Sequence, residues 1–159
     1  GEWVPLREQV FERCGENVYY AIGIKTRERP CGALERALVE TVRNLGLAEC
    51  VIVSSFNPFS LREIKRLDPA LRTALIYTSH PELPLPFRNG GGRFICRPDV
   101  LKPAHEKVHR RSMFYKGRLA GYPVLPWTVD DPDEARRLLS LGAEGIISNR
   151  PEELLHVFR

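Results

Sequence analysis

Two histidines that lie four residues apart are the first candidates for chemistry in this sequence. His105, Glu106 and His109 follow the order His-Glu-x-x-His, in which both histidines bind zinc and the glutamate acts as a base. Such a site needs a third ligand further along the chain, and charged neighbours such as Lys107 and Arg110 favour a solvated helix face. We therefore expect no zinc site at these residues.

Hydroxyl and thiol groups give no clear catalytic pattern either. Ser54 and Ser55 end an apolar run, but no nucleophile-elbow sequence surrounds them and no motif places a histidine to activate them. The cysteines contain no Cys-x-x-Cys pair and are widely spaced, at Cys14, Cys31, Cys50 and Cys96. This spacing predicts reduced thiols in a cytoplasmic protein rather than a disulfide framework or a structural zinc site.

Length and composition describe an ordinary globular domain. The chain has 159 residues, of which 43% are apolar and 28% are charged, so it can bury a hydrophobic core. This length predicts one domain over 1–159. The net charge of +4 rests on scattered arginines, so we expect no nucleic-acid partner. No apolar run approaches the roughly 18 to 20 residues of a membrane span.

The elements that must position any site alternate between strands and helices. Apolar runs predict strands at 18–24, 51–54, 73–77, 93–96, 122–129 and 144–148. Helical periodicity predicts helices at 30–45, 58–67, 100–113 and 132–141, with a last short helix that begins at 149–151. Asn57 and Asp131 are expected N-caps, each followed by a proline in the first helical turn.

This alternation predicts an α/β fold with about six parallel strands covered by helices. In such a sheet a functional site lies at the carboxyl ends of the strands. The candidate positions are Lys25 and Thr26, Ser54 to Phe56, Tyr77 to His80, Arg97, Trp127 to Asp130, and Ser148 to Arg150.

The segment from Tyr122 to Glu152 resembles the last third of the glycerophosphodiester phosphodiesterase family. Weaker markers in the family's order occur at 4–10, 53–57 and 127–130. Members of that family fold as (β/α)8 barrels and cleave glycerophosphodiesters with a divalent cation such as Ca²⁺ or Mg²⁺. A full barrel typically takes about 250 residues. The resemblance therefore implies an incomplete barrel, truncated to the equivalents of strands 3–8.

The family's catalytic motifs are the main departure from this resemblance. Its His-Arg-Gly, Glu-x-Asp and His-Asp segments, which supply acid/base histidines and metal carboxylates, would precede the first strand and find no equivalent here. Its third carboxylate comes from a Glu-x-Lys, and the matching tripeptide is Gly23-Ile24-Lys25. Metal-assisted hydrolysis needs oxygen ligands together with an acid and a base. We therefore expect no catalytic residue, no metal ligand and no cofactor in this chain, which would be inactive by itself.

Other functions stay open beside this one. An active phosphodiesterase could be completed by another chain, or could use other carboxylates such as Asp130, Asp131 or Glu144. A non-enzymatic assembly or phosphate-binding module is the other alternative, and the chain could also be a fragment of a larger enzyme.

Three residues are expected to bind ligand. The resemblance implies that Lys25 faces the substrate phosphate and that Trp127 packs against its glycerol part. Arg97, which follows a predicted strand, could join Lys25 in a small cationic site for phosphate or glycerophosphate.

The expected sheet leaves two open edges, at 18–24 and at 144–148, and an apolar barrel interior. Unpaired backbone groups at a sheet edge favour pairing with another chain. We therefore expect a homodimer that covers the open barrel face or the edge strands.

Overall fold

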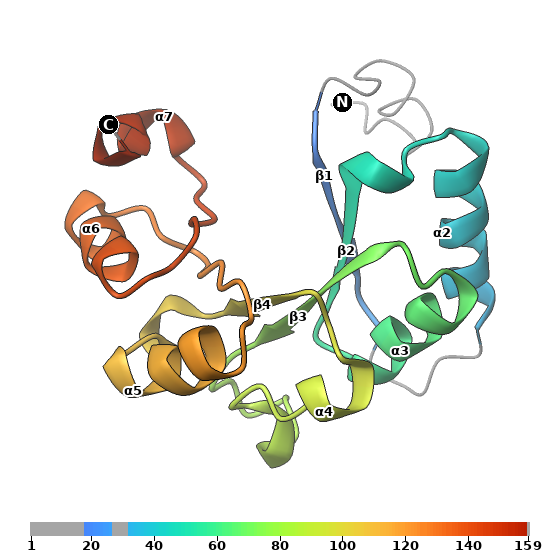
Figure 1. Cartoon of the computed structure of the whole chain (residues 1–159), viewed down its shortest axis with the longest axis horizontal. Coiled ribbons are helices and arrows are strands. Elements are labelled where there is room, and N and C mark those ends of the chain that lie inside the picture. Colours follow the sequence, from blue (N-terminus) through green and yellow to red (C-terminus); the bar gives the residue numbers. More distant parts are fainter. Residues whose placement is uncertain (1–17, 27–31, 159) are drawn as a thin grey trace.

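The structure is a computed structural model that describes residues 18–26 and 32–158 of the chain. Its centre is a parallel sheet with the strand order β1-β2-β3-β4 (Figure 1). These strands are β1 (Tyr20–Ile24), β2 (Val51–Ser55), β3 (Arg72–Tyr77) and β4 (Val100–Pro103). The helices that connect them are α2 (Ala33–Asn44), α3 (Pro58–Leu67) and α4 (Arg93–Cys96). The prediction of a parallel α/β fold is confirmed.

Two extended segments continue the parallel pairing beyond β4. The amides of Leu125 and Trp127 donate to Leu101 and Pro103 at 2.9 and 3.0 Å. The amide of Ile147 then donates to the carbonyl of Pro126 at 2.8 Å. The segments at 122–129 and 144–148 therefore lie where the last two strands were predicted, although their pairing is too sparse to form regular strands.

Two helices begin as their sequences predict. The Asn57 side chain accepts a hydrogen bond from the Phe59 amide at 3.0 Å, and Pro58 occupies the first position of α3. At α6 (Pro132–Ser140), Asp131 accepts from the Asp133 amide at 3.1 Å. Each cap satisfies an amide that has no partner inside its helix.

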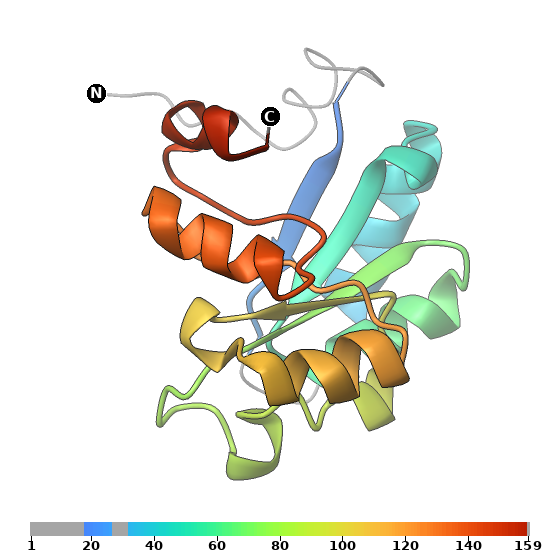
Figure 2. The same ribbon diagram turned by 60° about the vertical axis from the view of Figure 1, so that its left-hand side comes forward.

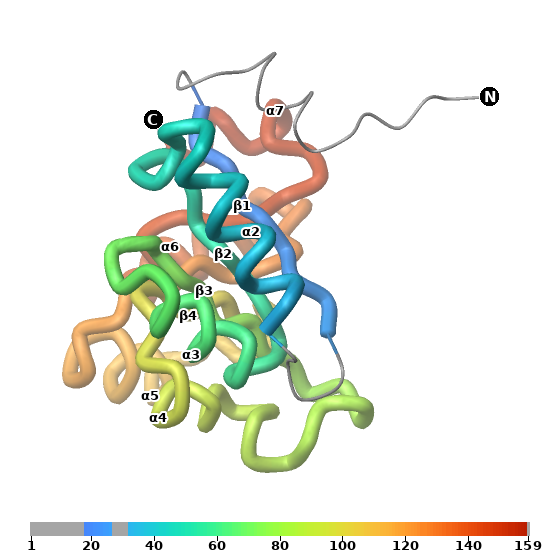
Figure 3. Tube along the Cα trace, turned by 90° about the vertical axis from the view of Figure 1, so that its right-hand side faces the viewer, coloured from blue at the N-terminus to red at the C-terminus, as the bar shows by residue number. Residues whose placement is uncertain are grey.

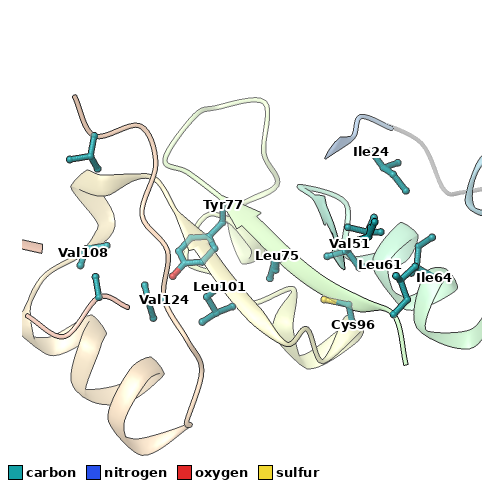
Figure 4. Packing of buried hydrophobic residues seen from close by; sticks show 14 of the residues in the cluster. Ile24, Val51, Leu61, Ile64, Leu75, Tyr77, Cys96, Leu101, Val108 and Val124 are labelled. Carbon is teal, nitrogen blue, oxygen red and sulfur yellow. The ribbon is translucent and has the colours of Figure 1, made fainter. Parts of the chain in front are cut away.

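The hydrophobic core lies between the sheet and the helices of one face. Figure 3 shows α2 and α3 side by side along β1 and β2. Val51, Leu75 and Leu101 point to this face and are at most 1% exposed, together with Leu61 and Ile64 of α3 (Figure 4). Removing this apolar area from water stabilises the fold by about 25 cal/mol per Å².

The segment from 93 to 113 corrects the sequence prediction. Residues 93–96 form the short helix α4 instead of a strand, and the strand comes later, as β4. A short apolar run does not distinguish strand from helix by its periodicity. Lys102 and Pro103 also make β4 hard to recognise as a strand from the sequence, because a charge and a proline are uncommon within a strand.

The expected helix at 100–113 is correspondingly wrong over most of its length. After β4 comes a single 3-10 turn, and the helix begins only at α5 (Arg110–Met113), which runs into a π-helix at Phe114–Leu119. Figure 2 shows this helical stretch beside α6, with α7 (Pro151–Leu154) beyond it. None of the helices in the described ranges is both long and apolar enough to cross a membrane.

Glu134 ties α6 to the turn after β4, which gives the first prediction. Its carboxylate accepts from Arg137 at 2.6 Å and lies 3.0 Å from His105 Nδ1. The Arg137 hydrogen bond is the main cause that lowers the pKa of Glu134 from 4.5 to about 2, with His105 adding to it. A carboxyl with a lowered pKa stabilises the fold above its unfolded pKa, and this stabilisation is lost as the pH falls toward the folded pKa.

We predict that Glu134→Gln lowers the free energy of unfolding by about 1 kcal/mol at pH 7. The difference from the unsubstituted protein should shrink between about pH 4.5 and pH 2, as urea unfolding at several pH values would show. Asp133→Asn is the matched control, because the Asp133 side chain is 88% exposed beside Arg136. A pH-independent difference would contradict this role.

Candidate functional site

We call the side of the sheet that faces away from α2, α3 and α4 the inner face. It would face the interior of a complete barrel, and it carries polar side chains. Side chains alternate between the two faces of a strand. Since Val53 and Leu75 point to the helices, Ser54 of β2 and Ala74 of β3 point to the inner face, where they are register partners. Gly23 of β1 lies beside Ser54 in the same row.

Lys102 of β4 spans this inner face. Its ammonium nitrogen donates to the Ser54 hydroxyl at 2.8 Å, and so crosses β3, where Ala74 presents only a methyl group. Lys102 is 5% exposed and Ser54 is 4% exposed. Burial disfavours the charged form, so desolvation lowers the pKa of Lys102. Within the described ranges no carboxylate forms an ion pair with this ammonium group.

The inner face around Gly23 does not fit a divalent cation. A Cβ atom at position 23 would meet nothing within 4 Å, so a side chain could start there, but the glycine supplies no carboxylate. The hydroxyl next to it already accepts from a lysine, whose charge repels a metal ion. Across residues 18–26 and 32–158, no group of three His, Cys, Asp or Glu side chains could hold a metal.

Trp127 lies on the segment that continues the sheet after β4. Its indole nitrogen donates to the carbonyl of Lys102 at 3.0 Å. Its ring meets the ring of Phe56 edge to face, with 5.8 Å between centroids. Phe56 follows β2 directly, so these aromatic groups join the carboxyl ends of β2 and β4. The structure therefore places Trp127 at the sheet end where a ligand was predicted, although its packing alone explains its position.

Lys25 also lies at the carboxyl end of the sheet, directly after β1. Its side chain is exposed, and its ammonium group makes no hydrogen bond or ion pair with the described residues. The next residue, Thr26, is held at 2.8 Å from Ser60 and accepts from Asn57. The backbone that carries Lys25 is thereby fixed against α3, while its charge stays available.

Arg97 lies at the opposite end of the sheet. It follows helix α4 rather than a strand, with φ at 44°, and precedes β4. Two residues later the Asp99 amide donates to Thr73, near the start of β3. The expectation that Arg97 follows a strand is wrong, because the strand that was to end at Cys96 is a helix. The structure does not bring Arg97 together with Lys25.

The carboxylates considered as alternative ligands serve local structure. Asp130 accepts hydrogen bonds from the Asn149 amide, the Asn149 side chain and the Ser148 hydroxyl. These contacts, the Asn149 amide first, lower the pKa of Asp130. Asp131 caps α6, and Glu144 begins the last extended segment, at the amino end of the sheet. Asp130 and Asp131 are therefore engaged in local hydrogen bonds.

The two histidines of the His-Glu-x-x-His pattern do not share a helix face. His105 lies in a 3-10 turn against Glu134, whereas His109 precedes α5 as its N-cap residue. The helix that would align both rings therefore does not form at these residues.

The contact between Lys102 and Ser54 was missed by the sequence analysis. Lys102 falls in a predicted helix, and Ser54, although it is among the candidate positions at the strand ends, has no predicted partner. The available signal was a single lysine in the apolar run Val100–Pro103, which would have indicated an inward-facing charge had the run been read as a strand.

Comparisons with known proteins agree with this geometry. Residues 2–153 match the model of the glycerophosphoryl diester phosphodiesterase family. A glycerophosphodiester phosphodiesterase of Caldanaerobacter subterraneus subsp. tengcongensis is 29% identical over 160 aligned positions, which cover all of this chain and 63% of that protein. The chain thus spans somewhat less than two thirds of the length of the curated relatives that it matches.

Solved structures of the same kind share the fold. The glycerophosphodiester phosphodiesterase of Parabacteroides distasonis superimposes with a TM-score of 0.75 at 21% identity, over 94% of this chain and 62% of that one. A phosphodiesterase of Oleispira antarctica, solved with the product sn-glycerol-3-phosphate, gives 0.67 at 20% identity over 94% and 58%. The sheet therefore corresponds to part of a TIM-type barrel. Its family match over most of its length shows that the chain belongs to the glycerophosphoryl diester phosphodiesterase family.

Proposed function

We propose that this chain is a phosphodiesterase-like module that binds a phosphate or glycerophosphate anion without a metal and does not hydrolyse the diester by itself. The observation that carries the proposal is the buried ammonium group of Lys102, which is held on Ser54, the register partner of Gly23. The family resemblance places a metal-binding carboxylate at position 23, and in this structure the ammonium group of Lys102 reaches the strand next to it.

A fixed ammonium group replaces part of what a metal does. It supplies positive charge to a phosphate oxygen, and the hydrogen bond from Lys102 to Ser54 holds it in place. It offers no open coordination position that would activate a water molecule. These features support binding of an anion without the hydrolysis that follows in an active relative.

Lys25 and Trp127 complete the proposed site. Lys25 brings an exposed, available charge to the same end of the sheet, and Trp127 presents an aromatic face near Lys102. The phosphodiesterase of Oleispira antarctica was solved with sn-glycerol-3-phosphate, and we carry this ligand class to the present chain. Arg97 is left out of the proposed site because it lies at the other end of the sheet.

An active enzyme completed by another chain is the competing function. It would need a carboxylate near Gly23, and of those considered for this role Asp130 and Asp131 are engaged in local hydrogen bonds, while Glu144 lies at the amino end of the sheet. We therefore place the binding function first.

The activity prediction concerns glycerophosphocholine. We expect no hydrolysis of glycerophosphocholine above background with millimolar Ca²⁺ or Mg²⁺, because Gly23 offers a metal ion no carboxylate ligand. We also expect sn-glycerol-3-phosphate to bind in the presence of EDTA, and Lys25→Met to weaken this binding about tenfold. Arg62→Gln, an exposed position on α3, is the control. Turnover that a chelator abolishes would contradict the proposal.

The third prediction concerns stability. We expect that Lys102→Met combined with Ser54→Ala keeps or raises the free energy of unfolding, by about 1 kcal/mol, because burying an ammonium group without a carboxylate is costly. The same double variant should lose sn-glycerol-3-phosphate binding. Urea unfolding and calorimetric titration would measure both quantities. A loss of several kcal/mol with binding retained would show that Lys102 is structural.

The homodimer expected from the sequence stays a proposal. It is supported by half-buried apolar residues on the inner face, such as Ile52 and Ile76, and by the exposed Ala21 on β1, whose pairing in the described sheet is with β2 alone. Light scattering should give twice the mass of one chain. A single-chain mass across micromolar concentrations would exclude self-association as the way in which this face is covered.

A further inference from the structure

A groove of about 580 Å³, lined by residues that follow β3 and β4 in the chain, gathers positive charge. It lies between the loop that follows β3 and the residues that follow β4. Four cationic side chains line it: Arg93, Lys107, Arg111 and Lys116. We call this set the basic groove.

The charge of the basic groove is not balanced within the described part of the chain. Glu106 is the acidic residue among its lining groups, and none of the four cations takes part in an ion pair between described residues. Lys107 donates to the Asn89 side chain at 3.0 Å, and Arg93 donates to the Gly90 carbonyl at 3.0 Å. Both partners are neutral, so the groove keeps a net positive charge.

Lys116 makes the groove more than a solvated cluster of surface charges. Its ammonium nitrogen donates to the Tyr77 hydroxyl at 3.2 Å and lies 4.6 Å from the centre of that ring. Tyr77 is 2% exposed, so its buried ring holds the Lys116 ammonium group in a fixed position. Desolvation first, then Arg93 and Lys107, lower the pKa of Lys116 to about 8. A bound anion would relieve this mutual repulsion.

We propose that the basic groove binds the phosphate group of a phosphorylated ligand, at a site separate from the inner face. Converging ammonium and guanidinium groups suit the several oxygens of a phosphate, and the guanidinium groups can bind two oxygens at once. Lys116 of the groove contacts Tyr77, whose side chain points to the helix-covered side as that of Leu75 does, whereas Lys102 faces the inner side. The inference does not depend on the function proposed for the inner face.

Residue-resolved NMR with inorganic phosphate tests the site directly. We expect the amide signals of Gly91, Lys107 and Ser112 to shift on titration, and Lys107→Met and Arg111→Gln each to weaken the effect about tenfold. Arg118→Gln is the matched control, because Arg118 lies on the same π-helix as Lys116 of the basic groove but lines a different groove. Lys102→Met should leave these shifts unchanged. Shifts confined to Gly23 and Ser54, or equal responses in the charge variants and the control, would overturn the proposal.

A second experiment distinguishes a lipid headgroup from a soluble phosphorylated ligand. Co-sedimentation with phosphatidylcholine vesicles that contain phosphatidic acid should retain the protein only if the groove accepts a lipid headgroup, and Arg111→Gln should then release it. Binding of free phosphate without vesicle binding assigns the groove to a soluble ligand. If chloride at equal ionic strength produced the same amide shifts as phosphate, the proposed specificity for phosphate would be wrong.

Discussion

The hydrogen bond between the Lys102 ammonium group and the Ser54 hydroxyl is the interaction on which the character of the inner face depends. It joins β4 to β2 across β3, and it is possible because Ala74 leaves room for the lysine side chain to lie over the sheet. A buried lysine without a carboxylate partner costs free energy. The hydrophobic core on the opposite, helix-covered face, in which Val51, Leu75 and Leu101 are almost fully buried, offsets that cost.

In the function proposed above, this placement of a cation changes what the barrel end binds. An enzyme of the family kind would gather carboxylates there to hold a metal, and in this chain Gly23 leaves the position open while Lys102 supplies the positive charge. The likeness to solved phosphodiesterases shows the fold, and the substituted residues support a different use of its open end. Groups that reduce stability are commonly retained where function needs them.

Much of the fold followed from local patterns in the sequence. Asn57 and Asp131 cap their helices as expected, and the apolar runs that became β2 and β3 are strands, because caps and buried strands are local signals. The stretch from Arg93 to Pro103 failed, since α4 has an apolar run typical of a strand and β4 carries a lysine. Once the strand was misplaced, Arg97 was assigned to the wrong end of the sheet and Lys102 was overlooked. The contact of Lys102 with Ser54 joins residues 48 positions apart, which no local pattern reveals.

The most direct test of the metal-free anion site is an NMR titration of the lysine side chains, labelled at the ε-carbon, with sn-glycerol-3-phosphate in EDTA. We predict that the Lys102 signal shifts and that its pKa rises, because a bound anion favours the charged form of the ammonium group. A Lys102 signal that stays unchanged while the ligand binds, or binding that appears only when Ca²⁺ is added, would contradict the claim that this lysine takes the place of the metal.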